Sequence, residues 1–136
     1  MAFSAYLNGK RSECRALVAE LRKTFEYVSI LGTDVRATVY RTDRRSSAIR
    51  DGEGECGFVV KMCNGRSFFE YSMSDLSGDP AVLAEKILSR VKADPSLSGK
   101  MISVGQIKDE PLKKDFVRDS DFDEYDDGKV LEFCSG

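Results

Sequence analysis

The chain has 136 residues, a net charge of −2, an apolar fraction of 41% and a charged fraction of 32%. This length fits one domain, and this composition is typical of a soluble globular protein. The sequence contains no histidine, which removes the commonest general base, the usual partner of serine and cysteine nucleophiles and the commonest zinc ligand. Because it has neither an apolar run of about 20 residues nor a signal peptide, we expect a cytoplasmic protein without a membrane partner.

Charge is unevenly distributed along the chain. Residues 97–136 carry six Lys/Arg and ten Asp/Glu, a net charge of −4, which leaves +2 for residues 1–96. Neither value is typical of a nucleic-acid-binding surface, which needs a clearly basic face, so we expect no nucleic-acid partner. The same division predicts an α+β domain over residues 1–96 and an acidic linker or arm over residues 97–136.

The first third of the chain predicts a helix followed by strands. The helix is expected in 12-SECRALVAELRKTF-25, with Ser12 as its cap. Its apolar stripe consists of Cys14, Leu17, Val18, Leu21 and Phe25. In residues 26–45, apolar Val35, Ala37 and Val39 alternate with polar residues, which is the period of a half-buried strand. A short strand is expected over residues 46–50, before the loop 51-DGEGE-55.

The stretch 54-GECGFVVKMCNGRSFFEYSMSDL-76 predicts a β-hairpin. Asn-Gly at 64–65 is the strongest short-range hairpin signal, because both central residues of such a turn need positive φ. A two-residue loop would pair Cys63 with Arg66 and Val60 with Phe69. One face is expected to be core and carries Phe58, Val60, Phe69, Tyr71 and Met73. The other face carries Val59, Lys61, Phe68 and Glu70, with Lys61 diagonal to Glu70 and Phe68 a candidate interface contact.

A second helix is predicted over 79-DPAVLAEKILSRVKAD-94. Asp79 is its expected cap and Pro80 its first residue. Its buried stripe is expected to contain Leu83, Ile87, Leu88 and Val91. The predicted order is α-β-β-β-β-α, which folds as a two-layer α+β sandwich with an antiparallel four-stranded sheet. Farther on, residues 100–107 are a candidate strand and residues 108–128 read as a polar linker.

The sequence offers few groups for catalysis or metal binding. Cysteines 14, 56, 63 and 134 include no Cys-x-x-Cys pair, so we expect reduced thiols rather than a zinc site. Cys56 and Cys63 lie seven apart, on opposite faces of one predicted strand. A thiol-dependent enzyme that uses Cys56 or Cys63 is an alternative, and it would require a lowered pKa at one of them.

Charged and glycine-rich segments give three further candidates. The run 119-DSDFDEYDDG-128 resembles a calcium loop, but counted from Asp123 it places Tyr125 third and Cys134 twelfth, where ligands are needed. Counted from Asp119, Glu124 replaces the required glycine, so we expect a solvated acidic segment. The glycines of 52-GEGECG-57 precede no helix, as a phosphate loop would require, and the carboxylates of Asp51, Glu53 and Glu55 have no fixed separation.

The five arginines at 36, 41, 44, 45 and 50 are candidates for phosphate binding. They are interleaved with Asp34, Asp43 and Asp51, which cancel much of the local field. We therefore expect a solvent-facing sheet edge, where charges discourage unwanted strand pairing.

The order of these segments resembles the N-terminal domain of the TldD/PmbA family, whose members are named as modulators of DNA gyrase. The likeness covers residues 12–95, and its markers are Gly57, Asn64-Gly65, Phe69 and Ser74-Asp75-Leu76. It implies a cytoplasmic, dimeric or heterodimeric protein that processes unfolded peptides. It also implies a zinc-dependent metalloprotease centre on a His-Glu-x-x-x-His helix of a following domain.

This sequence has no such motif, so no catalytic, cofactor-binding or metal-ligating residue carries over to it. We expect a non-catalytic N-terminal domain that helps to form the peptide channel and the dimer, with zinc only in a separate C-terminal domain. The helix expected to begin in 129-KVLEFCSG-136 suits a domain boundary. The alternative is a freestanding protein-binding module without enzymatic activity, which recruits its partner through Phe68 and the acidic tail.

Overall fold

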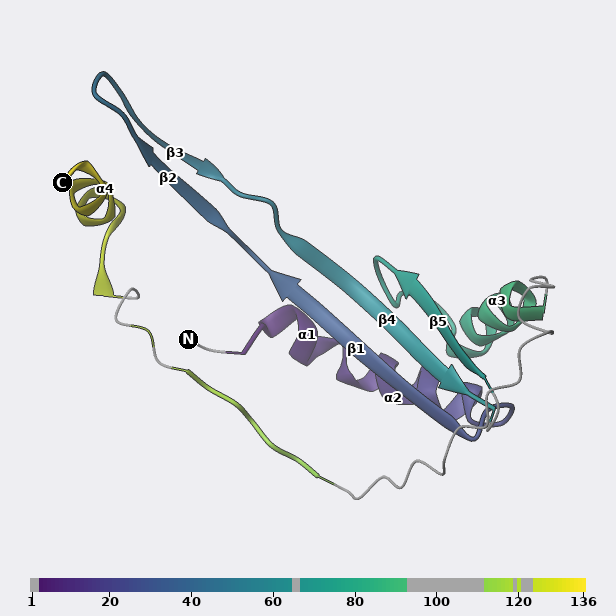
Figure 1. Cartoon of the computed structure of the whole chain (residues 1–136). Helices are drawn as coiled ribbons and strands as arrows, with labels where there is room; N and C mark the ends of the chain where they lie inside the picture. The colour runs from purple at the N-terminus through teal and green to yellow at the C-terminus, as the bar shows by residue number, and fades with distance from the viewer. Residues whose placement is uncertain (1–2, 65–66, 93–111, 119, 121–123) are drawn as a thin grey trace.

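The computed structural model describes residues 3–64, 67–92, 112–118, 120 and 124–136 (Figure 1). It is an α+β structure in which every strand pairing is antiparallel. Its helices are α1 (Ala5–Gly9), α2 (Arg11–Leu21), α3 (Pro80–Lys92) and α4 (Asp127–Ser135). Its strands are β1 (Tyr27–Val35), β2 (Thr38–Thr42), β3 (Ser47–Asp51), β4 (Glu55–Cys63) and β5 (Phe68–Met73). None of the described helices is long and apolar enough to span a membrane.

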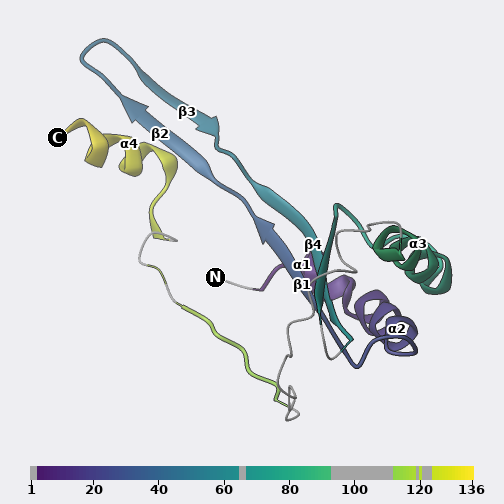
Figure 2. The same cartoon turned by 45° about the vertical axis from the view of Figure 1, so that its right-hand side comes forward.

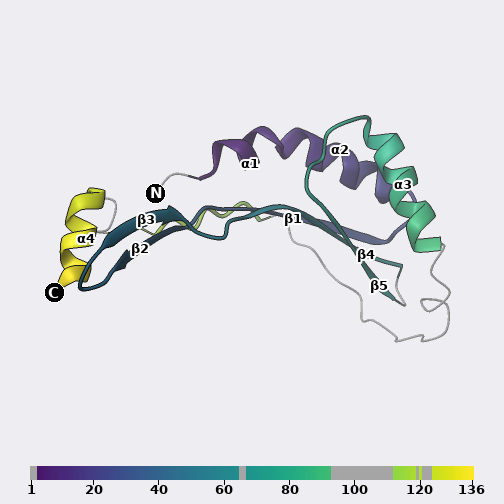
Figure 3. The same cartoon turned by 90° about the horizontal axis from the view of Figure 1, so that it is seen from above.

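The main sheet has three strands in the order β1-β4-β5. Helices α1, α2 and α3 lie over one face of it, as Figures 2 and 3 show. The core forms between this face and the helices, and its fully buried side chains are Leu17, Leu21, Met62, Ile87 and Val60. Burial of such side chains drives folding by about 1.5–3 kcal/mol each. The predicted stripes of both helices are confirmed, because they supply Leu17, Leu21 and Ile87 to this core.

The prediction of a four-stranded sheet is wrong. The described strands form a three-stranded sheet and a separate two-stranded ribbon, β2–β3. The ribbon continues the β1–β4 pair, and the break lies where the Gly52 amide donates to the Ala37 carbonyl at 2.7 Å. A Cβ on Gly54 would lie only 2.8 Å from the Val35 carbonyl oxygen, so the two chains approach closely there. The strand predicted at 46–50 exists as β3, but every residue of β3 is exposed.

The β4–β5 hairpin has the predicted core face in a different register. Cys63 pairs with Phe68 and Val60 pairs with Tyr71, a displacement of two residues from the prediction. Asn64 and Ser67 hydrogen-bond to each other beyond the Cys63–Phe68 pair, so the predicted two-residue loop of Asn64-Gly65 is wrong. A displacement of two leaves every side chain on its own face, which is why the core face is correct and the pairs are wrong.

The helix ends differ from prediction at α2 and agree at α3. Lys10 stands at the N-cap of α2 and its side chain makes no capping hydrogen bond, and Ser12 instead donates to Glu13 at 3.0 Å. The predicted cap at Ser12 is therefore wrong. Asp79 accepts from the amide of Ala81 at 2.8 Å, which confirms the predicted cap of α3.

Two helices lie outside the main predictions. Helix α1 was not predicted, although its cap Ser4, which accepts from the Leu7 amide, is a recognisable start signal. The helix expected from residue 129 is present as α4, which begins at Asp127 after the cap Asp126. The candidate strand 100–107 lies outside the described residues, as does much of the predicted linker.

Candidate functional site

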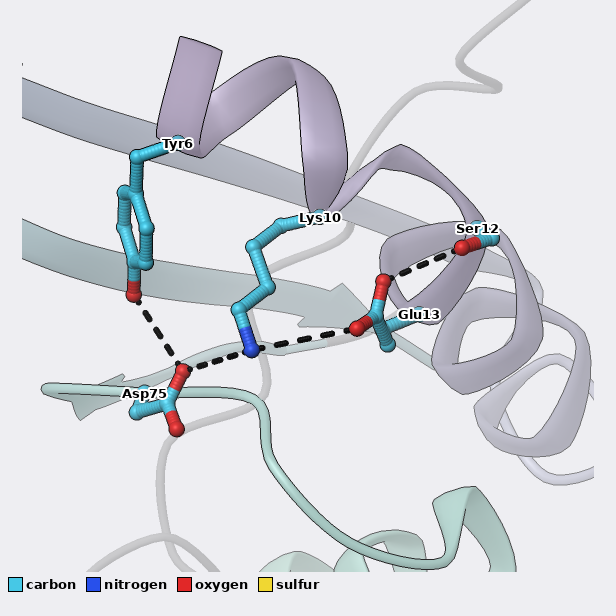
Figure 4. A network of polar contacts seen from close by, with 5 residues as sticks. All are labelled: Tyr6, Lys10, Ser12, Glu13 and Asp75. Atoms are coloured by element: carbon cyan, nitrogen blue, oxygen red, sulfur yellow. Dashed lines mark hydrogen bonds and ion pairs between the residues drawn. The ribbon is translucent and has the colours of Figure 1, made fainter. Parts of the chain in front are cut away.

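A polar network joins the two N-terminal helices to the loop after β5 (Figure 4). The Lys10 ammonium lies 3.0 Å from the Asp75 carboxylate and 3.8 Å from that of Glu13. The Tyr6 hydroxyl donates to Asp75 at 3.2 Å. Asp75 is followed by Leu76, which is buried in the core. The network therefore joins α1 and α2 to the segment that follows β5.

We call this network of Tyr6, Lys10, Glu13 and Asp75 the clamp. Its pKa shifts fit a structural role rather than a catalytic one. The hydrogen bond from Lys10 lowers the pKa of Asp75, and the same bond raises the pKa of Lys10. Burial, followed by the hydrogen bond to Asp75, raises the pKa of Tyr6. A lysine nucleophile or a general base at neutral pH needs a pKa that moves toward 7, and these shifts go the other way.

The cysteines do not form a common site. Cys63 is 3% exposed, and in the register it lies between Tyr27 and Phe68. Cys56 is exposed and stands opposite Asp34. Burial raises the pKa of Cys14. None of the four cysteines forms a disulfide, and this arrangement gives no support to a thiol-dependent enzyme.

The metal and phosphate candidates are not brought together either. Among the described residues, no three His, Cys, Asp or Glu side chains gather as a metal site. Of the calcium-loop candidate, Asp119 and Asp123 lie outside the described residues, and Asp126 caps α4. A Cβ on Gly57 would lie 2.9 Å from the Met73 carbonyl oxygen, so this glycine permits close strand packing. That is a structural reason for the glycine that involves no ligand.

The face of the main sheet that lies opposite the helices is the first candidate binding surface. Leu31 and Val59 pair at its centre, and Leu31 is 66% exposed. Phe68 is 41% exposed on the same face, with the Lys61 ammonium 5.5 Å from its ring centroid. Lys61 and Glu70 pair directly at 3.0 Å, not diagonally as predicted. We call this surface, defined by Leu31, Val59 and Phe68, the uncovered face.

The β2–β3 ribbon is the second candidate surface, and sequence reasoning underestimated it. Its arginines 41, 44, 45 and 50 are all exposed. Asp43 is held within the turn, where it accepts from the amides of Arg45 and Ser46. These bonds hold the pKa of the Asp43 carboxyl below its usual value.

Helix α4 covers one side of this ribbon. The Tyr40 hydroxyl donates to Asp127 at 2.5 Å, and the Thr42 hydroxyl donates to the Cys134 carbonyl at 3.1 Å. Val130 is the buried residue of α4. The hydrogen bond to Asp127 raises the pKa of Tyr40. No sequence signal pairs positions 87 residues apart, so this contact was not predicted.

Comparison with protein-family models, with curated proteins and with solved structures finds no match to this chain. The TldD/PmbA resemblance therefore stays a prediction made from the sequence. Its marker residues have structural roles here: Asp75 lies in the clamp, and Phe69 and Leu76 lie in the core.

Proposed function

We propose that this chain is a non-catalytic domain of a TldD/PmbA-like metalloprotease, in which it helps to form the channel for unfolded peptide and the dimer. One observation carries the proposal: the main sheet has an uncovered face, and among the described strands β1 and β5 are each paired on one side only. A strand with a free edge can accept an extended peptide as an additional strand. The helices and sheet would then be two layers of a sandwich, and the substrate would pair with an edge strand of the sheet layer.

The chemistry of the described residues suits a supporting role. Lys10 and Asp75 hold each other in charged forms, and the acidic residues offer no gathered metal site among the described positions. In this proposal zinc belongs to a separate domain that carries the His-Glu-x-x-x-His helix. The four cysteines form no disulfide, which is consistent with the cytoplasmic location in this proposal.

Peptide binding to the 136-residue chain tests the proposal. A fluorescently labelled, unstructured neutral peptide is expected to bind, and fluorescence anisotropy measures its dissociation constant. The same peptide with N-methyl groups at alternate residues keeps its side chains but loses main-chain donors along one edge. Strand addition predicts that this peptide binds much more weakly. Equal binding of the two peptides would contradict it.

The gating role needs a protein that joins this chain to its metalloprotease domain. Deletion of residues 1–96 is expected to change the selection of unfolded over folded substrates. Unchanged proteolysis of both substrate types would reject a gating role.

The second candidate is a freestanding protein-binding module, and the exposure of Leu31 and Phe68 on one face favours it. The open reading frame beyond Gly136 separates the two candidates. A His-Glu-x-x-x-His helix in that frame supports the first, and its absence supports the second. Phe68→Ala is expected to weaken partner binding in either case.

A further inference from the structure

The β2–β3 ribbon has two chemically different faces. Side chains alternate along a strand, so Tyr40 and Thr42, which contact α4, share one face of β2. Arg41 points to the opposite face. Because residues paired across two strands share a face, Arg50, which pairs with Val39, lies on the same face as Arg41. The face turned away from α4 is therefore basic.

The aspartates near these arginines are directed elsewhere. Asp43 is held by the turn, where both carboxylate oxygens accept hydrogen bonds from backbone or hydroxyl donors. Asp51 pairs with Thr38 and so lies on the face of Tyr40. Asp34 accepts from the Ser4 hydroxyl. Among the described residues, no ribbon arginine forms an ion pair, so none of these guanidinium groups is held by an aspartate of the chain.

The spacing of the arginines suits an extended polypeptide. Arg41 and Arg50 are diagonal neighbours across the two strands, and Arg44 and Arg45 continue the basic surface into the turn. Carboxylates at alternate positions of an extended chain are separated by about 7 Å. Diagonal positions across a sheet have a similar separation of about 7–8 Å.

Nucleic acid fits this surface less well. Single strands bind by stacking their bases on aromatic side chains, and this face of the paired strands carries Val39, Arg41, Ala48 and Arg50 instead. The ribbon's tyrosine, Tyr40, lies on the other face and is bonded to Asp127. The whole chain has a net charge of −2, whereas duplex-binding domains are strongly basic.

We propose that Arg41, Arg44, Arg45 and Arg50 form a docking surface for an acidic polypeptide segment in extended conformation. This surface lies on the ribbon, away from the helix-covered main sheet (Figure 1). It is separate from the uncovered face, so it can exist whether or not that face binds peptide. The carboxylates of the partner supply the ion pairs that the protein's own described aspartates do not form with these arginines.

The test uses the full chain and a labelled peptide of alternating glutamate and serine, measured by fluorescence anisotropy at low salt. The Glu–Ser peptide is expected to bind, and the matched Gln–Ser peptide is not. Arg41→Glu/Arg50→Glu is expected to weaken binding at least about tenfold, because it places like charges against the peptide. Added salt weakens the wild-type complex.

The matched control is Arg15→Glu/Arg22→Glu, which changes the net charge by the same amount at two exposed positions on or beside α2. It is expected to bind the Glu–Ser peptide like the wild type, apart from a small general charge effect. Arg41→Gln/Arg50→Gln, checked for folding by circular dichroism, is expected to lose affinity by a smaller factor than the reversal.

Three results would overturn the proposal. They are no binding of the Glu–Ser peptide, equal weakening by the ribbon and α2 variants, and tighter binding of a thymidine oligonucleotide or a DNA duplex than of the peptide. The last result would assign the surface to nucleic acid. The neutral peptide that tests strand addition to the main sheet is expected to bind the ribbon variants like the wild type, so the two proposals fail independently.

Discussion

The main sheet and the β2–β3 ribbon are made from the same two stretches of chain, yet only one of them has a core. In the main sheet, β4 contributes Phe58, Val60 and Met62 to a buried cluster beneath α2 and α3. In the ribbon, β3 is exposed along its whole length. Alternation of apolar and polar residues occurs in both. A strand face becomes core only where a helix covers it.

The ribbon shows what a strand pair does when, of the described helices, only the short α4 lies against one side of it. An isolated two-stranded hairpin is marginally stable in water, so the ribbon depends on its continuity with β1 and β4 and on α4. Its outer face is consequently free to carry arginines at no cost to a core. The main sheet thus supplies most of the stability of the fold. The exposed positions of the ribbon can carry binding residues without disturbing a core.

The largest expected effect is on stability, and it contrasts the two regions directly. Leu21→Ala removes a side chain that is fully buried under the main sheet, and it is expected to cost about 2–5 kcal/mol. Ile49→Ala changes a ribbon residue that is 42% exposed, and it is expected to stay within about 0.5 kcal/mol. Urea unfolding of both variants measures the difference. Similar losses would mean that the ribbon has an apolar core of its own.

Amide hydrogen exchange sharpens the same comparison without mutation. The β2 and β3 amides are expected to exchange on the order of 100-fold faster than those of residues 58–62, because local opening of the ribbon exposes little apolar surface. Mass spectrometry of peptic fragments resolves the two regions. Equal protection would show that sheet and ribbon open as one cooperative unit.

The helices could be predicted from the sequence because their signals are local. The stripe of α2 and the Asp79-Pro80 start of α3 are each formed by residues that lie close together in the sequence. Both are found where expected. Strand faces were also predictable, since the buried Phe58 and Val60 alternate with less buried neighbours. Both patterns depend only on the period of the backbone.

The grouping of strands into sheets could not be predicted. The alternation of apolar and polar residues shows which face of a strand is buried, but not which strand it pairs with. Val39 and Val60 alternate with their neighbours in the same way, yet only Val60 is buried. Register depended on the turn, and the Asn-Gly signal indicated a two-residue loop that the pairing of Cys63 with Phe68 excludes. A displacement of one residue would have reversed the faces.

The candidate surfaces were only partly visible in the sequence. The five arginines from 36 to 50 were evident, but the hydrogen bonds that occupy Asp34 and Asp43 appear only in space. The clamp is even harder to predict from the sequence. Lys10 and Asp75 are far apart in the chain, and nothing in the sequence distinguishes either from an ordinary surface charge. Proximity created by folding has no local sequence signal.

The clamp gives a smaller, pH-dependent prediction for the main sheet. Asp75→Asn is expected to lower the melting temperature at neutral pH by less than Leu21→Ala does. The pKa of Asp75 is lowered from 3.8, so its contribution is present above that value and is lost as the pH falls through the lowered pKa. The pKa of Lys10 is raised from 10.5, so its contribution is present below that value and is lost as the pH rises through the raised pKa.

The melting temperatures of wild type and Asp75→Asn across pH test this expectation. Their difference is expected to be flat from about pH 5 to 9 and to shrink toward both extremes. Glu85→Gln, at an exposed position on α3, is the control and is expected to show a much smaller difference. A difference between wild type and Asp75→Asn that persists unchanged at pH 2 would show that the carboxylate charge is not what the clamp uses.

The smallest expected effect concerns one of the two hydrogen bonds described between the ribbon and α4. Tyr40→Phe removes the hydroxyl that donates to Asp127 and keeps the ring, so α4 is expected to exchange its amides faster while α3 is unchanged. The bond raises the pKa of Tyr40 above 10.0, so its contribution is present below that value and is lost as the pH rises through the raised pKa. Alkaline wild-type protein is therefore expected to resemble the variant in α4 exchange, once the intrinsic rate is corrected for pH.

Tyr71→Phe, a tyrosine packed against the core of the main sheet, is the matched control. If it loosened α4 equally, the helix would be held by the stability of the whole sheet rather than by its contact with the ribbon, and the two regions would be less independent than their burial indicates.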